Sequence, residues 1–251
     1  MPPTLFASDL HLTPERPALA SAFRVFCARP AREAQAVYLL GDLFDWWIGD
    51  DQLRDPFDAA VAEAIRGVTR AGVPVHVAHG NRDFLLGEGF AAATGATFLP
   101  ERTVVDVHGT PTLLSHGDEL CTGDADYQRF RARMRDPATQ RRLLRLPRFV
   151  RRAIARGLRA RSRDATALKP ESILDVDEQA VADAFRRFGV ARMIHGHTHR
   201  PATHHVDVDG RACERIVLPD WYEAGRYLQV DATGAVVREV PGIGPRDRGT
   251  D

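Results

Sequence analysis

The sequence has little lysine and cysteine and no long apolar run. Of its 34 basic residues, Lys169 alone is a lysine, and the others are arginines. The three cysteines are odd in number and form no Cys-x-x-Cys pair, which does not suit a disulfide framework and favours a reducing, cytosolic compartment. No stretch is apolar enough to cross a bilayer, and the first residues lack the basic and apolar regions of a signal peptide.

Net charge is also absent, because 34 basic residues balance 34 acidic ones. A formal charge of zero argues against a general nucleic-acid binder, so no nucleic-acid partner is expected. The length of 251 residues and the hydrophobic fraction of 44% suit one globular domain with a full core and a small insertion.

Short apolar runs are followed by polar motifs at five places. Strands are predicted over residues 4–8, 36–40, 73–78, 112–114 and 192–194, and helices over 18–28, 56–71 and 177–188. The motifs that follow the strands are Asp9-Leu10-His11, Gly41-Asp42, Gly80-Asn81-Arg82-Asp83, Ser115-His116-Gly117-Asp118 and His195-Gly196-His197. This alternation predicts an α/β fold in which the motifs converge at one edge of a sheet.

Beyond His199 the pattern changes to alternating residues, which predicts antiparallel strands over 203–208, 212–218, 227–230 and 236–240. We expect a four-layer α-β-β-α sandwich, with two central sheets flanked by helices. Its core would comprise residues 1–124 and 170–240, and the glycine-, proline- and charge-rich tail 241–251 is expected to be disordered.

Residues 125–169 are predicted to form a helical insertion that acts as a lid over the motifs. Arginine recurs from Arg129 to Arg163, where Asp136 is the sole acid. Apolar residues spaced three and four apart give this segment one apolar and one basic face. Pro147 is expected to kink or restart the helix.

Seven motif residues carry hard oxygen or imidazole nitrogen atoms, and they are Asp9, His11, Asp42, Asn81, His116, His195 and His197. This mixed set suits Mn, Fe, Co or Zn better than Mg or Ca. Two such ions roughly 3.5–4 Å apart activate a water and hold a phosphoryl group, so the pattern predicts hydrolysis of a phosphate ester.

The motif order Asp-x-His, Gly-Asp, Gly-Asn-x-Asp, His-Gly and Gly-His-x-His resembles that of the calcineurin-like metallophosphoesterase superfamily. The chain is more closely similar, from about residue 4 to 230, to the UDP-2,3-diacylglucosamine pyrophosphohydrolases of the lipid A pathway. That similarity rests on the aromatic segment from Gly41 to Asp51, which ends in Gly-Asp-Asp, and on the insertion after Cys121-Thr122.

The resemblance implies two Mn²⁺ ions, one held by Asp9, His11, Asp42 and His197 and the other by Asp42, Asn81, His116 and His195. It implies a catalytic set of Asp42, Asn81, His116 and His195. The implied substrate contacts are Asn81, Arg82, Asp124, Ser162, Thr166, Lys169 and His195, where Thr166 departs from the asparagine usual in the family.

The implied reaction is hydrolysis of the pyrophosphate bond of UDP-2,3-diacylglucosamine by attack of an activated water on the α-phosphorus. Its products are UMP and 2,3-diacylglucosamine 1-phosphate (lipid X). The implied partners are the acylated UDP-sugar and the cytoplasmic face of the inner membrane, to which a monomeric protein would attach peripherally. The apolar face of the insertion would shelter acyl chains, and its basic face would meet phosphate or lipid.

Two other functions are compatible with the sequence: a dinuclear phosphoesterase acting on other nucleotide pyrophosphates or cyclic nucleotides, and a non-catalytic protein that binds membranes or RNA through the basic helix.

Some residues beside the motifs have simpler interpretations. Asp45, Asp83 and Asp118 are expected to support the ligands. His79 and His199 are expected to orient neighbours, and His108, His204 and His205 to lie at the surface. At least one of Trp46 and Trp47 is expected in the core.

Overall fold

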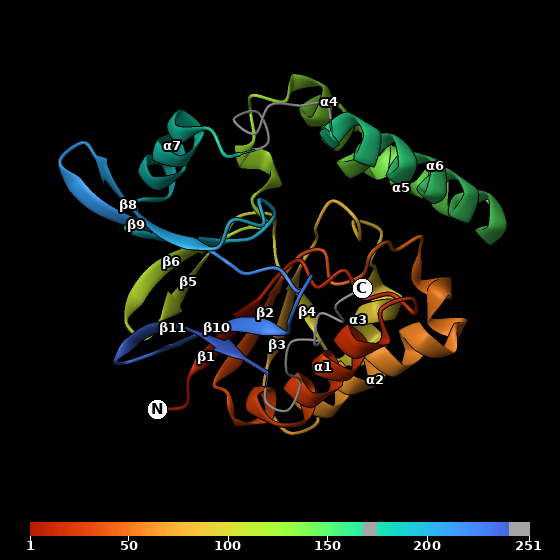
Figure 1. Ribbon diagram of the computed structural model, residues 1–251, viewed down its shortest axis with the longest axis horizontal. Helices are drawn as coiled ribbons and strands as arrows, with labels where there is room; N and C mark the ends of the chain where they lie inside the picture. Colours follow the sequence, from red (N-terminus) through yellow and green to blue (C-terminus); the bar gives the residue numbers. More distant parts are fainter. Residues whose placement is uncertain (168–174, 241–251) are drawn as a thin grey trace, which may run out of the picture.

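Two sheets pack face to face in the computed structural model, which describes residues 1–167 and 175–240, without the side chains of residues 160–167 (Figure 1). The first sheet has the strand order β11-β10-β1-β2-β3-β4. Its strands are β1 (Thr4–Ala7), β2 (Ala36–Leu40), β3 (Val75–Ala78), β4 (Thr97–Phe98), β10 (Arg226–Asp231) and β11 (Gly234–Glu239). Strands β1 to β4 run parallel, and β10 pairs antiparallel with β1.

The second sheet has the order β5-β6-β7-β9-β8. Its strands are β5 (Thr103–Val107), β6 (Thr110–Leu114), β7 (Arg192–His195), β8 (Ala202–Val208) and β9 (Arg211–Val217). The three central strands β6, β7 and β9 are parallel, and each edge strand is the antiparallel partner of its neighbour.

Helices cover the outer faces of both sheets. On the first sheet lie α1 (Pro17–Ala28), α2 (Pro56–Thr69) and α3 (Glu88–Thr94), and on the second lies α7 (Glu178–Phe188). Short 3-10 turns span Pro30–Glu33, Asp50–Arg54 and Asp118–Leu120. Side chains from both sheets, among them Phe6, Ile194 and Leu228, form the cluster between them. The predicted four-layer sandwich is therefore confirmed.

Local sequence explains where these helices begin and end. Proline occupies the first position of both α1 and α2, where its fixed φ suits a helix and no amide donor is lost. Asp177 caps α7 by accepting a hydrogen bond from the amide of Ala180, and Gly189 ends it with a φ of 65°. Strands β1 and β2 are buried along their whole length, which is why they read as continuous apolar runs.

The arginine-rich segment forms three helices, α4 (Ala125–Arg135), α5 (Pro137–Leu144) and α6 (Arg148–Ala167), here called the cap. In Figure 1 they lie to one side of the sheets. Asp124 and Asp136 cap α4 and α5, and α6 begins directly after Pro147, where an interruption was predicted. The predicted tail 241–251 lies outside the described residues.

No helix in the described part of the chain is long and apolar enough to cross a membrane. Of the two tryptophans, Trp47 lies in the core and Trp46 is partly exposed.

Replacing Phe90 by alanine should lower the free energy of unfolding by about 3–5 kcal/mol, the usual cost of deleting a buried phenylalanine. Phe90 is fully buried, and its ring centroid lies 5.5 Å from that of Trp47. Urea unfolding of the variant measures this loss. Phe149→Ala is the matched control, because Phe149 is 75% exposed, and its effect should stay within about 0.5 kcal/mol. Equal losses in the two variants would contradict this packing.

Candidate metal centre

Five loops meet where parallel strands of both sheets end. The loops after β1, β2 and β3 come from the first sheet, and those after β6 and β7 come from the second. The polar side chains that these loops bring together are Asp9, His11, Asp42, Asn81, His116, His197 and His199. Sequence positions from 9 to 199 thus supply one site, as the strand-end pattern predicted.

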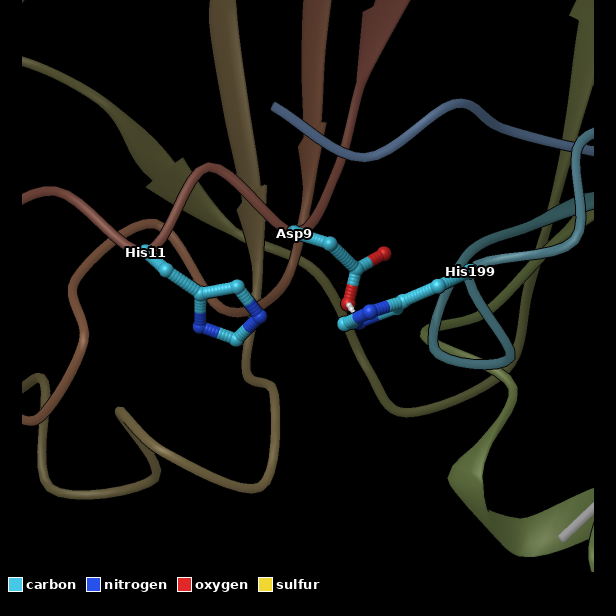
Figure 2. Close-up of side chains that lie close together, drawn as sticks. All are labelled: Asp9, His11 and His199. Atoms are coloured by element: carbon cyan, nitrogen blue, oxygen red, sulfur yellow. Dashed lines mark hydrogen bonds and ion pairs between the residues drawn. The ribbon is translucent and has the colours of Figure 1, made fainter. Parts of the chain in front are cut away.

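Asp9, His11 and His199 form the first group of potential ligands (Figure 2). One ligand atom from each lies within 4.8 Å of the others, and His199 Nε2 donates to Asp9 Oδ1 at 3.2 Å. Both ring nitrogens of His11 are buried without a hydrogen-bond partner among the described residues. Buried polar atoms are rarely left unsatisfied, so this imidazole fits a cation ligand.

Asn81, His116 and His197 form the second group. The Oδ1 atom of Asn81 lies 3.1 Å from His116 Nε2 and 3.2 Å from His197 Nδ1. The rings of the two histidines are 5.1 Å apart. An amide oxygen and two imidazole nitrogens therefore converge beside the first group.

Asp42 lies between the two groups. One carboxylate oxygen is 3.8 Å from His11 Nε2, and the other is 3.9 Å from His116 Nε2. These distances are too long for hydrogen bonds. They match atoms that share an ion, because two ligands bound at about 2.1 Å lie at most about 4.2 Å apart. Each oxygen of Asp42 can thus serve one group, which is the geometry of a bridging carboxylate.

The backbone at this edge is strained. Seven described residues other than glycine have a φ in the left-handed region, and five of them are Asp9, His11, Asp42, His197 and His199, with φ between 45° and 70°. Such conformations are costly for residues with a Cβ atom and gather at functional sites. The strain thus marks five of the seven residues that the side-chain distances bring together.

Two glycines let the loops approach one another closely. A Cβ atom on Gly80 would collide with Asp42, and one on Gly196 would collide with Ser8 and Asp9. Glycine is required where backbones pack this tightly. Both glycines therefore set the spacing between loops that carry ligands.

Burial decides the charge of two of the candidate imidazole ligands, His11 and His197, in the absence of a metal. It lowers the pKa of His11 to about 3 and that of His197 to about 4. Both rings are therefore neutral near pH 7 and keep a lone pair that can bind a cation. For His116 burial acts in the same direction, but the Asp42 and Asp9 carboxylates outweigh it and raise the pKa to about 9.

The two aspartates respond in opposite directions. Burial raises the pKa of Asp42 to about 7. For Asp9 the same desolvation is outweighed by the hydrogen bond from His199 and by the charge of His116, so its pKa lies well below the usual range. Asp42 is therefore the carboxylate whose negative charge most needs a further cation.

Asp83 takes the supporting place that the sequence predicted for it, whereas the side chain of Asp118 contacts the cap. Asp83 accepts hydrogen bonds from the amides of Leu43 at 2.8 Å and Gly80 at 2.7 Å, which fixes the loops carrying Asp42 and Asn81. Asp118 accepts from Tyr127 Oη at 2.9 Å. His204 and His205 are exposed, as predicted, and His108 is partly exposed.

The geometry corrects the predicted places of the last histidines. His195 is fully buried, and its nitrogens contact Arg215 at 3.2 Å and the carbonyl of Gly196 at 2.9 Å, so it joins neither group. It is the last residue of β7, held within the sheet, whereas His197 and His199 lie in the loop beyond it. His199 therefore lies beside Asp9 and His11, where His197 was predicted, and His197 lies beside Asn81 and His116, where His195 was predicted. The Gly-His-x-His spacing of residues 196–199 is the signal that identifies this pair.

The predicted substrate contacts are only partly described. Arg82 is partly exposed, and its amide donates to Asp42 at 2.8 Å. Asp124 is nearly buried and caps α4 by accepting from the amide of Tyr127 at 3.1 Å. The side chains of Ser162 and Thr166, and the whole of Lys169, lie outside the described residues.

The cap reaches the candidate site through contacts that the sequence did not predict. The Tyr127 ring stacks on His197, with centroids 5.9 Å apart. Arg135 donates to the carbonyls of His79 and Gly80, each at 3.1 Å. The cap therefore touches the second ligand group directly.

Other cap arginines pair with acids of the core loops. Arg151 is buried and pairs with Asp51, and Arg159 pairs with Asp45. Further along the same face, Arg148 and Arg152 share Asp55. The near absence of acids within the insertion has a structural reason, since the acidic partners of its arginines lie on the core. Part of the basic face therefore pairs with acids of the core.

Comparison with known proteins agrees with this geometry. The sequence profile of the calcineurin-like phosphoesterases matches residues 2–201. A protein of Cellvibrio japonicus named UDP-2,3-diacylglucosamine hydrolase is 49% identical over 235 residues, covering 94% of this chain and 98% of that protein. A protein of the same name from Pseudomonas paraeruginosa is 48% identical over 230 residues, covering 92% and 95%.

Among solved structures, a dimetal phosphatase from Danio rerio aligns with 96% of this chain and 100% of its own, at 13% identity and a TM-score of 0.49. The family profile and the near full-length relatives decide the classification. The chain belongs to the calcineurin-like phosphoesterase family, together with the relatives named UDP-2,3-diacylglucosamine hydrolase.

Proposed function

We propose that the protein hydrolyses the pyrophosphate bond of UDP-2,3-diacylglucosamine to UMP and 2,3-diacylglucosamine 1-phosphate, a step of lipid A biosynthesis. The names of relatives almost half identical along nearly the whole chain support this substrate. The observation that carries the chemistry is Asp42, a buried residue that lies between two groups of candidate ligands with one oxygen turned to each.

Two divalent ions fit the residues present, because carboxylate, amide and imidazole atoms converge and the ring nitrogens of His11 have no hydrogen-bond partner among the described residues. Mn²⁺ is our expected metal, since such a mixed donor set suits it. The proposed ligands of one ion are Asp9, His11, Asp42 and His199. The proposed ligands of the other are Asp42, Asn81, His116 and His197. When bound, the ions supply an activated water and neutralise charge on the phosphoryl oxygens.

The chain's own residues bind and orient the pyrophosphate. The backbone amide of Arg82 donates to Asp42, which holds this residue beside the site, and its guanidinium is our proposed phosphate contact through paired N–H donors. Asp83 and Gly80 hold the loop on which Asn81 and Arg82 stand. Water attacks the α-phosphorus, so no nucleophilic side chain is required. Asp124, Ser162, Thr166 and Lys169 remain predicted contacts to the substrate.

Asp42→Ala should abolish turnover, because it removes the carboxylate assigned to both ions. We expect UMP formation from UDP-2,3-diacylglucosamine with Mn²⁺ to fall by at least about a thousandfold, roughly 4 kcal/mol of transition-state stabilisation. Chromatography of UMP measures the rate, and His204→Ala, at an exposed site on β8, is the control. Near wild-type turnover would refute the bridging role. Faster hydrolysis of an unacylated UDP-sugar by the wild type would instead favour another nucleotide substrate.

His199→Ala should lose about one of the two bound metals, because it removes a ligand of the first ion. His195→Gln should retain both, since His195 contacts Arg215 and the backbone. Plasma mass spectrometry of the folded proteins counts the metal, and circular dichroism verifies the fold. Loss of metal from the His195 variant together with full occupancy in the His199 variant would reverse our assignment.

We further propose that the protein is a monomer that attaches peripherally to the cytoplasmic face of the inner membrane through α6. Phe149 on α6 is 75% exposed, and Leu144 at the end of the preceding helix α5 is 46% exposed. A hollow of about 530 Å³ beside Phe149 is lined by Arg148, Phe149, Arg152, Ala153 and Arg156. Exposed apolar side chains among arginines are typical of helices that lie in the interface of an anionic bilayer.

Phe149→Glu should weaken binding to vesicles of phosphatidylethanolamine and phosphatidylglycerol, because it places a carboxylate against anionic lipid. Co-sedimentation should show at least a threefold smaller bound fraction. Val236→Glu on β11 is the matched control, an exposed apolar residue outside the cap. The same loss in both variants, or in neither, would argue against α6 as the membrane contact.

A further inference from the structure

A tyrosine and an arginine stand at the edge of the metal centre without a role in ligand binding. The Tyr222 ring stacks on His11, with centroids 5.5 Å apart, and lies 5.2 Å from the ring of His199. The Arg16 guanidinium lies over the same tyrosine, 4.9 Å from its centroid. Both histidines belong to the first ligand group, whereas the cap's Tyr127 stacks on His197 of the second.

The pair is held in place by buried neighbours. Trp221 is fully buried against Phe23 and Phe26, and its amide donates to the carbonyl of Asp9 at 3.2 Å. The next residue, Tyr222, donates its amide to Asp220 at 2.9 Å. Arg16 donates to the Tyr222 carbonyl. Both side chains are thus positioned before any ligand binds, which reduces the entropy lost on binding.

Its exposure to solvent distinguishes Tyr222 from the other aromatic residues of this segment. The ring is 49% exposed, although Trp221 and Tyr227 nearby are buried. The exposed aromatic side chains of the described residues are Phe149, on the cap, and Tyr222, at the metal centre. An exposed aromatic ring beside polar catalytic groups is typical of a ligand contact.

We propose that Tyr222 and Arg16 form the subsite for the nucleoside half of the substrate, an inference that rests on the proposed function. When the pyrophosphate lies between the two ligand groups, the nucleoside on one phosphate and the acylated sugar on the other extend in opposite directions. The cap lies beside the second ligand group and carries the exposed apolar side chains that suit acyl chains. The nucleoside half then lies beside the first ligand group, which contains His11 and His199, and reaches Tyr222.

The chemistry of the pair suits a pyrimidine base. Bases stack on aromatic rings and on guanidinium planes, and the exposed part of Tyr222 and the Arg16 plane offer both. The N–H groups of a guanidinium donate to carbonyl oxygens, of which uracil has two on its ring. The positive charge of Arg16 also favours the phosphate attached to the nucleoside.

The test compares UMP with ribose 5-phosphate, which lacks the base, as ligands of the Mn²⁺-loaded protein in calorimetry. The wild type should bind UMP about five- to a hundredfold more tightly, the range expected for stacking of one base. Tyr222→Leu should reduce this preference to less than about threefold, and Tyr222→Phe should keep it. Arg16→Ala should reduce it in part, whereas Arg70→Ala, on an exposed arginine paired with Glu63, should not change it.

A purely structural role of Tyr222 predicts a different outcome. In that case Tyr222→Leu weakens both ligands equally or lowers the metal content, and the proposal is overturned. Equal binding of the two ligands by the wild type overturns it as well. A preference for UMP in a wild-type protein that forms no UMP from UDP-2,3-diacylglucosamine supports the subsite while it refutes the proposed substrate, so the two failures are distinguishable.

Discussion

The site depends on the cost of burying several carboxylates together. Asp9, Asp42, Asp83 and Asp118 are each at most 2% exposed. Negative charges so placed require cations or hydrogen-bond donors. Asp83 has backbone amides, Asp118 has Arg131 and Tyr127, and Asp9 has His199. Asp42 has the least complete compensation, which is visible in its raised pKa. The surrounding structure thus favours binding of positive charge at Asp42, whose two oxygens are turned to different ligand groups.

The same principle attaches the cap to the core. Its arginines find their counter-charges on loops of the core, and Asp118 joins both systems because it accepts from Arg131 of α4 and stands two residues beyond His116. The cap is therefore coupled electrostatically to the loop that carries a ligand. Its position and the geometry of the second ligand group are adjusted together, and partly buried pairs of this kind are screened by salt less than exposed ones.

Much of the fold was predictable because it follows from periodicity. The apolar runs before Asp9, Asp42 and Asn81 are buried strands, and the amphipathic segment 177–188 packs on the second sheet as α7. The histidines near 197 were less predictable, because an apolar run does not show at which residue the strand ends, and an error of two residues exchanges a sheet position for a loop position. Contacts between segments far apart in the chain could not be predicted from the sequence pattern. Arg16 and Tyr222 are 206 residues apart, and nothing local to either indicates the other.

The antiparallel pairing of β10 with β1 places Thr4 opposite Val230. This edge of β1 therefore has no neighbouring strand until the residues of β10 have been synthesised. Trp221, whose amide holds the Asp9 carbonyl, arrives equally late. A partly synthesised chain has all five motif loops well before it has the strand that closes the sheet around them. Completion of the centre thus depends on contacts between residues far apart in the sequence, and such contacts form more slowly than local ones.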